Sequence, residues 1–479
     1  MPISKERSTI EVKAERVVLA AVRLPDSSYD QRDPFGELRA LAEQAGAVVV
    51  GELSQRLERP VASTFMGSGK ITELKALCEG LEAASVIFDH DLSPKQISNI
   101  EKEIGRKVVD RSELILDIFA SRAVTHEAQL QVELAQLECT YPRLRAMWDH
   151  LERIVGHGGI GGIGTRGPGE QQLEIDRRLV QERKNRLQRQ LHEIQARKRR
   201  EVAARRQEHF TVGLVGYTNA GKSTLFNTLT AGGAYADDRL FATLMTRTRQ
   251  WDLGGGLEVM LSDTVGFVRD IPHHLVASFK ATLEEATHAD LLLIMLDVSD
   301  PAAELQYKTV NTVLDELFEE LAQSAHDEDR FWKPPERLLL LNKADRLKDN
   351  AEVLVWQRKV PNSIPLCALP GDPITPPTGQ AALVAKVREA VLREVEELRV
   401  SVPLRDAKTI HIIENRGEVL DRQYPDDGQS VVIHARVGRR LLAQLRSAGA
   451  RIEAADTRGR PVAINPLRPE AARPGWNQD

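Results

Sequence analysis

The stretch that decides the fold reads Gly216-Tyr217-Thr218-Asn219-Ala220-Gly221-Lys222-Ser223, with Thr224 next. The two glycines of this G-x4-G-K-S pattern let the backbone curl so that its N–H groups converge on phosphate oxygens. Lys222 adds a positive charge at the β- and γ-phosphates, and the Ser223 hydroxyl suits Mg²⁺. A buried strand is expected just before it, at Thr211–Val215, and a helical pattern follows. This setting disfavours a chance match in a loop and predicts a phosphate loop in an α/β domain.

A second motif, Asp263-Thr264-Val265-Gly266, follows the next strand expected in this domain, Glu258–Ser262. A carboxylate at this strand end can hold Mg²⁺ through a water, and a glycine lets the backbone approach a γ-phosphate. A D-x-x-G sequence is common on its own. Its place at a strand end downstream of the phosphate loop makes the assignment much more specific. We therefore assign Asp263 and Gly266 to the part of the site that responds to the γ-phosphate.

The stretch between the two motifs contains Leu240-Phe241-Ala242-Thr243. A threonine there can complete the Mg²⁺ shell while the γ-phosphate is present and release it after hydrolysis, which is an order–disorder switch. We expect Thr243 to do so, with Thr246 and Thr248 as alternatives. The predicted metal ligands are Ser223 and Thr243, and the predicted catalytic groups are Lys222, Thr243 and Gly266.

Guanine recognition is predicted from Asn342-Lys343-Ala344-Asp345, which ends the expected strand Arg337–Asn342. An aspartate in this place accepts hydrogen bonds from guanine N1 and the exocyclic amine, which adenine cannot supply. Such a site rejects the wrong base steeply, because its polar groups would be left unpaired. A polar turn that caps the next helix is the alternative. Across the base we expect the loop Cys367-Ala368-Leu369, with the Ala368 N–H as its donor.

Phe267 follows Gly266, where many small GTPases have the glutamine that orients the attacking water. A phenyl ring cannot orient a water. The sequence therefore predicts slow intrinsic hydrolysis, completed by a partner or by another residue of the switch region. The alternative is that Phe267 only packs against the sheet.

The chain has 479 residues, enough for two to four domains. Residues 1–120 alternate short apolar runs with helical patterns, which predicts a small α/β domain. Its strands are expected at Arg16–Val22, Ala47–Leu53 and Ser85–Phe88, and its helices at Leu38–Ala45, Ile71–Leu81 and Pro94–Ile104. Gly67–Lys70 is interpreted as a turn that opens a helix, with a second nucleotide contact as the alternative.

Residues 121–208 are predicted to form an antiparallel helical hairpin. Its tip, residues 156–169, contains eight glycines, a composition that neither a helix nor a strand tolerates. Its second arm repeats Leu173, Val180, Leu187 and Ile194 every seven residues. The segment from Asp176 to Arg206 contains twelve Lys or Arg and four Asp or Glu, which gives it a net charge of +8. A basic rod with a bare glycine tip suits folded RNA, whereas a solvated helix face is the simpler alternative.

Residues 209–400, the G domain, are predicted to form a mostly parallel, doubly wound sheet that binds GTP. Its other strands are expected at Leu291–Asp297 and Ile364–Cys367, and its last helix at Ala381–Leu398. Residues 401–479 are predicted to form a small α+β domain and a tail. Alternation at Thr409–Ile413 and Ser430–Val437 predicts strands there. The fold class is therefore α/β, with this smaller α+β addition.

The total charge is close to balance, with 65 Lys and Arg against 70 Asp and Glu. Three cysteines without a C-x-x-C pair exclude a disulfide framework and disfavour a cysteine zinc site. The longest apolar run, Leu291–Leu296, is far shorter than the ~20 residues of a membrane helix, and no secretory signal is recognisable. We therefore expect a cytoplasmic monomer with at most peripheral membrane association.

The motifs together resemble those of translation-factor-related GTPases, and their flanks resemble the HflX family. The flanking matches lie at Gly216–Thr224, Phe241–Thr243, Asp263–Leu275, Gly159–Arg177 and Asp110–Glu127. Two departures stand out. Family members commonly read FATLDPTTR where this chain reads FATLMTRTR, and they carry serine at the position of Cys367.

This resemblance implies a Mg²⁺-dependent GTPase that converts GTP to GDP and binds the 50S ribosomal subunit through 23S rRNA. It also implies that the glycine tip points toward the peptidyl-transferase region, and that the protein splits or rescues stalled 70S ribosomes under stress. Two alternatives stay open. One is a GTPase acting in 50S assembly, and the other is an RNA-binding adaptor that uses GTP only as a structural ligand.

Overall fold

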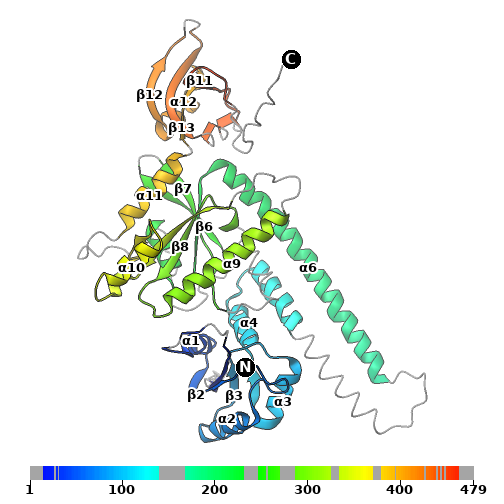
Figure 1. Ribbon diagram of the computed structural model, residues 1–479. Helices are drawn as coiled ribbons and strands as arrows, with labels where there is room; N and C mark the ends of the chain where they lie inside the picture. Colours follow the sequence, from blue (N-terminus) through cyan, green and yellow to red (C-terminus); the bar gives the residue numbers. More distant parts are fainter. Residues whose placement is uncertain are drawn as a thin grey trace, which may run out of the picture. The chain divides into compact units, whose positions relative to one another are not determined.

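The computed structural model (Figure 1) describes residues 15–25, 29–30, 32–139, 168–230, 246–254, 257–269, 286–324, 334–369, 379–393, 395–425, 428–438, 441–442, 445–446 and 449–462. These residues form one six-stranded and two four-stranded sheets. Within this part of the chain, no helix has an apolar stretch long enough to cross a bilayer.

The N-terminal sheet consists of four parallel strands in the order β2-β1-β3-β4. Its elements are β1 (Arg16–Arg23), α1 (Gly36–Gln44), β2 (Val48–Arg56), α2 (Ser68–Gly80), β3 (Ser85–Phe88), α3 (Pro94–Ile104), β4 (Lys107–Val109) and α4 (Arg111–Arg122). β1 is buried along nearly its whole length, as expected for a parallel strand covered on both faces. The expected strands and helices are confirmed. β4, which has only three residues, leaves no pattern that predicts it.

Two local features explain where these helices begin. A capping box formed by Ser93 and Gln96 precedes α3 and satisfies backbone N–H groups at its start. α2 begins at Ser68 with Gly67 as its N-cap. The Gly67–Lys70 stretch therefore opens a helix, as interpreted from the sequence.

Buried charges close the carboxyl end of this sheet beside β1 and β3. Arg23 ends β1 and donates to Asp89, which follows β3, at 3.1 Å. Arg111 is 1% exposed and donates to Asp89 at 2.7 Å and to Glu37 at 2.8 Å. Two guanidinium groups and two carboxylates thus compensate one another inside the protein. We call these four residues the closing cluster.

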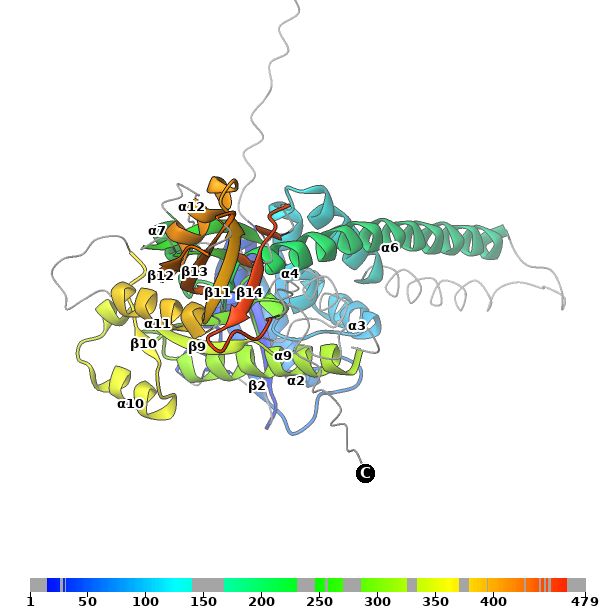
Figure 2. The same cartoon turned by 90° about the horizontal axis from the view of Figure 1, so that it is seen from above.

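A helical pair follows the N-terminal sheet. Residues 126–139 form a helix that is joined to α6 (Pro168–Glu208), the long helix seen in Figures 1 and 2. The ion pairs between the two helices are Arg183–Glu133 at 2.6 Å and Lys184–Glu138 at 2.8 Å. Leu187 of the heptad stripe is fully buried. The predicted seam is confirmed there, while residues 140–167, with most of the glycine tip, lie outside the described residues.

The G domain contains a six-stranded sheet in the order β10-β9-β8-β5-β7-β6. Its strands are β5 (Thr211–Gly216), β6 (Arg247–Gly254), β7 (Leu257–Asp263), β8 (Leu291–Asp297), β9 (Glu336–Asn342) and β10 (Ile364–Pro365). All pairs are parallel except β6 with β7, which is antiparallel. The mostly parallel sheet is confirmed.

The helical elements described in this domain are α7 (Lys222–Leu229), α9 (Ala303–Ser324), the 3-10 turn η1 (Ala344–Arg346), α10 (Ala351–Lys359) and α11 (Gln380–Arg393). The prediction that the last helix reaches Leu398 is wrong. α11 ends at Arg393, and β11 (Val395–Pro403) begins two residues later. Pairing of β11 with two other strands outweighs the helical preference of its glutamates.

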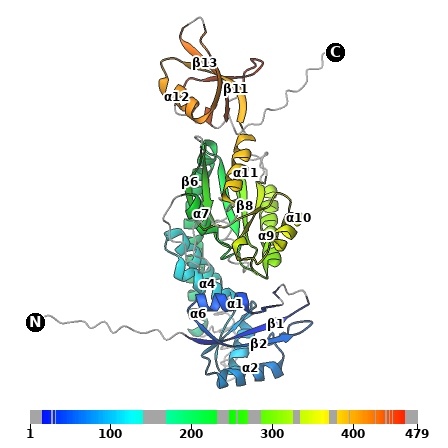
Figure 3. The ribbon, with the colours of Figure 1, turned by 90° about the vertical axis from the view of Figure 1, so that its left-hand side faces the viewer.

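The C-terminal sheet is antiparallel, in the order β12-β13-β11-β14. Its further elements are α12 (Ala407–Arg416), β12 (Glu418–Gln423), β13 (Ser430–Gly438) and β14 (Glu453–Asp456), and Figure 3 shows α12 beside β13. The strand predicted at Thr409–Ile413 is wrong, because these residues lie in α12. Asp406 caps this helix by accepting from the Thr409 N–H at 3.2 Å. The strand at Ser430–Val437 is confirmed.

Candidate nucleotide-binding site

The phosphate loop, residues 216–223, connects β5 to α7, and both of its motif glycines have positive φ. The values are +152° for Gly216 and +96° for Gly221. A Cβ on Gly216 would lie 2.3 Å from the carbonyl oxygen of Met295. A Cβ on Gly221 would lie 2.2 Å from Nδ2 of Asn342. Conformation and space therefore both exclude any side chain at these two positions.

Lys222, the first residue of α7, turns its ammonium group back into the loop. Nζ donates to the carbonyl oxygens of Gly216 at 3.1 Å and Tyr217 at 2.8 Å. Burial lowers the pKa of Lys222 to about 8, and the negative charge of Asp263 opposes that shift. A phosphate in the loop would be a stronger acceptor than these neutral carbonyls, because charge-assisted hydrogen bonds are roughly twice as strong.

Ser223 and Asp263 meet beside the loop. The Ser223 hydroxyl donates to Oδ2 of the fully buried Asp263 at 2.7 Å. A hydroxyl and a carboxylate are the hard oxygen ligands that Mg²⁺ prefers, so the pair fits that ion. No group of three His, Cys, Asp or Glu side chains is placed to bind a metal within the described ranges. Mg²⁺ would therefore take its remaining ligands from water and phosphate oxygens.

The third predicted motif around the metal, Phe241-Ala242-Thr243, lies outside the described residues. Both of its alternatives, Thr246 and Thr248, lie among the described residues. The Thr248 hydroxyl lies 3.0 Å from that of Ser262, on the neighbouring strand β7. Thr248 is thus engaged within the sheet, and the assignment of Thr243 stays a prediction.

The base side of the site is organised by Asn342, which is almost completely buried at the end of β9. Its Nδ2 donates to the carbonyl oxygen of Ala220 at 2.7 Å, and its Oδ1 accepts the Ala368 N–H at 3.0 Å. The amide thus bridges the phosphate loop to the base loop, residues 367–369. This differs from the prediction that the Ala368 N–H faces the base, because in this structure Asn342 takes that donor.

The other two residues of the guanine motif take different positions. Lys343 has a φ of +58° and forms an ion pair with Asp297, the last residue of β8, at 2.7 Å. Asp345 lies in η1 with its side chain exposed to solvent. An exposed carboxylate there is able to receive donors from a base. The recognition role of Asp345 stays a prediction.

A row of hydrogen bonds ties residues 264–269, the switch segment, to the phosphate loop and β5. The Phe267 N–H donates to the carbonyl of Gly216 at 3.0 Å, and the Phe267 carbonyl accepts the Thr218 N–H at 2.8 Å. The Thr264 hydroxyl donates to the Leu214 carbonyl at 2.6 Å. The Phe267 side chain is fully buried. It packs inside the domain, so this side chain cannot orient a water as a glutamine in its place would.

Three family models match successive parts of this chain. Residues 32–120 match the GTP-binding GTPase N-terminal model, residues 122–206 the GTP-binding GTPase middle region, and residues 211–343 the 50S ribosome-binding GTPase model. GTPase HflX of Lacrimispora saccharolytica is 38% identical over 441 residues, covering 91% of this chain and 97% of its own. The chain belongs to the HflX family of GTPases.

A further relative agrees with this membership. GTPase HflX of Escherichia coli is 44% identical over 314 residues, covering 65% of this chain and 70% of its own. A crystal structure of a GTP-binding protein from Sulfolobus solfataricus in complex with GDP is 23% identical, with a TM-score of 0.39, and covers 78% of this chain and 98% of its own. As a member of the HflX family, the chain is a GTPase.

Two side chains of this HflX-family protein hold the base loop, and no motif in the sequence indicates them. The Thr228 hydroxyl, from α7, donates to the carbonyl of Ala368 at 2.7 Å. Nε2 of Gln380, the first residue of α11, donates to the carbonyls of Cys367 at 3.1 Å and Leu369 at 3.3 Å. Both contacts join segments far apart in sequence. A lone threonine and a lone glutamine carry no spacing signal that could have identified them.

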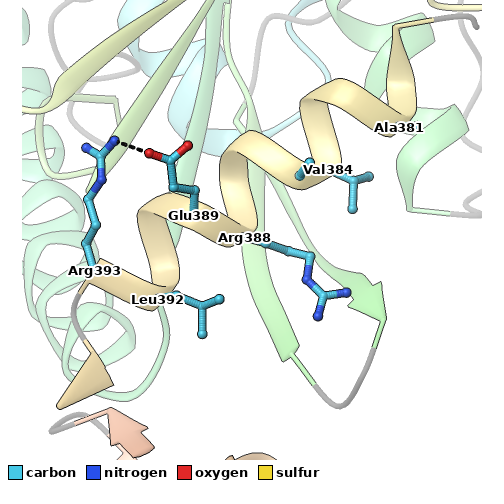
Figure 4. A pocket seen from close by; sticks show the side chains of 7 residues that line it. Ala381, Val384, Arg388, Glu389, Leu392 and Arg393 are labelled. Carbon is cyan, nitrogen blue, oxygen red and sulfur yellow. Dashed lines mark hydrogen bonds and ion pairs between the residues drawn. The ribbon is translucent and has the colours of Figure 1, made fainter. Parts of the chain in front are cut away.

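A hollow on α11 does not belong to the nucleotide site. Figure 4 shows Val384, Arg388 and Leu392 on one side of the helix, with Glu389 and Arg393 on the other. Arg388 donates to the carbonyl of Leu253, at the end of β6, at 3.3 Å. None of the predicted nucleotide-binding residues lines it. In this family member the hollow therefore reflects the packing of α11 beside β6.

Proposed function

We propose that this GTPase acts on the large ribosomal subunit. In its GTP form, with Mg²⁺, it binds the 50S subunit through 23S rRNA and separates stalled 70S ribosomes. Hydrolysis to GDP then releases it. We place this activity in the cytoplasm and assign it to the monomer.

The observation that carries this proposal is the basic surface of α6, on a chain whose residues 211–343 match the 50S ribosome-binding GTPases. Among the side chains of α6 that the structure describes, the exposed arginines are Arg178, Arg186, Arg189, Arg197 and Arg200. Two of them pair with a glutamate one turn away, Arg178 with Glu182 and Arg197 with Glu201. Such exposed pairs contribute little to stability, so these arginines can exchange their carboxylates for phosphates.

The nucleotide residues have the following proposed roles. Lys222 neutralises charge on the β- and γ-phosphates, while backbone N–H groups of the phosphate loop hold them. Ser223 and Thr243 hold Mg²⁺, which neutralises charge on the transferred phosphoryl group when it is bound. Gly266 brings its N–H to the γ-phosphate, and Asp345 selects guanine. Because Phe267 is buried and apolar, we expect slow hydrolysis by the protein alone and faster hydrolysis on the ribosome.

Sucrose-gradient sedimentation tests the ribosomal step. Purified 70S ribosomes are incubated with the protein and either a non-hydrolysable GTP analogue, GDP or no nucleotide. We expect separated subunits, with the protein on the 50S fraction, only with the GTP analogue. Protein on 50S subunits with intact 70S particles would instead support a role in assembly. A GTPase rate that 50S subunits leave unchanged would support the RNA-binding adaptor.

A charge-removal variant tests the basic arm. Replacing Arg197, Lys198, Arg199 and Arg200 with alanine removes four positive charges, so 50S affinity should fall and its salt dependence should flatten. The control removes four exposed positive charges from the N-terminal domain, at Lys95, Lys102, Arg106 and Lys107. Equal affinities and salt slopes for both variants would show that the arm is only a solvated helix.

A further inference from the structure

The Tyr217 side chain makes a contact to which no sequence motif assigns a role. Tyr217 is the second residue of the phosphate loop, and its hydroxyl oxygen accepts the backbone N–H of Arg269 at 2.8 Å. The two residues are only 7% and 6% exposed. The bond therefore joins the phosphate loop to the far end of the switch segment in a place shielded from water. A shielded hydrogen bond is costly to lose, because its donor must then find another acceptor.

Together with other hydrogen bonds, this bond fixes the switch segment on both sides of Gly266. Before Gly266, the Thr264 hydroxyl donates to the Leu214 carbonyl at 2.6 Å. After it, Phe267 exchanges two backbone hydrogen bonds with the phosphate loop, and Arg269 is held by Tyr217. The switch segment is thus fixed at three successive points against β5 and the phosphate loop.

Gly266 itself lies directly against the phosphate loop. A Cβ added to it would be 2.8 Å from Cα of Thr218 and 2.9 Å from Nζ of Lys222. The Gly266 backbone is therefore beside the ammonium group that serves the phosphates. A small displacement of the switch segment would move the Gly266 N–H relative to that group.

Because residue 267 is a phenylalanine, the position of the Gly266 backbone matters more for hydrolysis. The phenyl ring is buried and cannot orient a water. The backbone of the switch segment therefore has a larger part in the reacting geometry, and hydrogen bonds to the phosphate loop hold it in place. A misplacement of about 1 Å can cost on the order of a hundredfold in rate.

We propose that Tyr217 is a positioning residue for GTP hydrolysis. Its hydroxyl fixes the Arg269 N–H and thereby holds Phe267 and Gly266 in register with the phosphate loop. This inference rests on the proposed assignment of residues 216–223 to the phosphates. It adds that hydrolysis depends on a phenolic oxygen whose partner is the backbone N–H of Arg269.

The test compares Tyr217→Phe with the unaltered protein in GTP hydrolysis without ribosomes. The substitution removes only the hydroxyl oxygen, so we expect kcat to fall about tenfold and KM for GTP to stay within twofold. Hydrogen exchange of the 264–269 peptide should accelerate about tenfold in the same variant. Tyr307→Phe is the matched control, because Tyr307 packs edge-on against Trp356 on the outer helices. It should change neither quantity.

Four outcomes are informative. An unchanged kcat in Tyr217→Phe would overturn the inference, as would a kcat loss without faster exchange in residues 264–269. If Tyr217→Phe does not fold, Thr264→Val removes the bond on the other side of Gly266 and should lower kcat in the same selective way. Absence of GTP binding in the unaltered protein would contradict the proposed nucleotide site instead, so the two failures are distinguishable.

Discussion

β1 of the N-terminal sheet ends at Arg23, whereas β5 of the G domain ends at Gly216, and each strand lies where its sheet reverses strand order. Ligands of open parallel sheets bind at such reversal points, beyond the carboxyl ends of the strands. In the N-terminal sheet, the guanidinium groups of Arg23 and Arg111 meet Asp89 at this place. In the G domain, glycines leave backbone groups to line it.

These two strand ends show that strand order alone does not make a ligand site. Large charged side chains fill the space at the end of β1, and their partners are already inside the protein. At the end of β5 lie a glycine with positive φ and a lysine that donates to two neutral carbonyls, so an anion would be a stronger partner for this loop. We infer that the closing cluster is structural and that the phosphate loop is functional.

The largest expected effect comes from breaking the closing cluster. Arg111→Met keeps the aliphatic stem but leaves Asp89 and Glu37 with one guanidinium fewer in a buried place. Removing one partner of a buried ion pair costs about 3–5 kcal/mol, so the free energy of unfolding should fall by that amount in urea titration. Arg106→Met, at an exposed position, is the control. A loss below about 1 kcal/mol would show that the cluster is not structural.

Filling the phosphate loop should abolish nucleotide binding. Gly216→Ala places a methyl group 2.3 Å from the Met295 carbonyl, at a φ that alanine rarely adopts. We expect GDP affinity, measured by fluorescent-nucleotide titration, to fall more than a hundredfold. Gly69→Ala, in α2, is the control because nothing lies within 4 Å of its new methyl group. Near-normal GDP binding by Gly216→Ala would contradict the geometry of the loop.

The buried lysine predicts a pH dependence of the nucleotide-free protein. The pKa of Lys222 is about 8 in the folded chain, against an ordinary value of 10.5 for lysine. Between these values the unfolded state binds more protons, so stability should rise with pH. From pH 8 to 9.5 the gain is about 1.6 kcal/mol, because the slope of 1.36 kcal/mol per pH unit is reached only where the folded chain has lost the proton and the unfolded chain keeps it.

Urea unfolding at the two pH values measures that gain. The unaltered protein should gain about 1.6 kcal/mol more than Lys222→Met, which has no group to titrate there. Saturating GDP should remove the difference, because a phosphate raises the pKa of Lys222 again. Identical pH profiles for both proteins would show that the ammonium is not desolvated.

The smallest expected effect concerns the base loop. Gln380→Ala removes the two hydrogen bonds to Cys367 and Leu369, while the bonds of Thr228 and Asn342 remain. We expect KM for GTP to rise about threefold, with kcat unchanged, because loss of a hydrogen bond of this kind costs roughly 1 kcal/mol or less. An unaltered KM would mean that the loop is held without Gln380.

Patterns with strong periodicity predicted most of the sheets. Leu291–Asp297 is an uninterrupted apolar run and forms β8 at the predicted bounds, since central parallel strands are buried on both faces. β6 escaped prediction because it is an edge strand, whose buried side chains are limited to Trp251 and Leu253. Thr409–Ile413 alternates like a strand, yet the Asp406 cap and burial of Thr409 and Ile413, four residues apart, favour a helix.

The site was predictable only where spacing carries the chemistry. Gly216, Gly221 and Asp263 stand in motifs, and the structure brings them together around Lys222. The hydrogen bonds from Thr228 and Gln380 to the base loop depend on how α7 and α11 approach that loop, which no local pattern encodes. The same holds for the hydroxyl of Tyr217, whose partner lies 52 residues away.

The most direct test of the whole account changes the base preference through Asp345. Asp345→Asn replaces the acceptor for guanine by a donor that matches the 2-oxygen of xanthine. A non-hydrolysable xanthosine triphosphate analogue should then support co-sedimentation of the variant with 50S subunits, while the GTP analogue no longer does. The unaltered protein should show the opposite preference. If the variant still requires the GTP analogue to bind 50S subunits, the guanine assignment is contradicted. If the variant and the unaltered protein bind equally well without nucleotide, the nucleotide-controlled ribosome binding is contradicted.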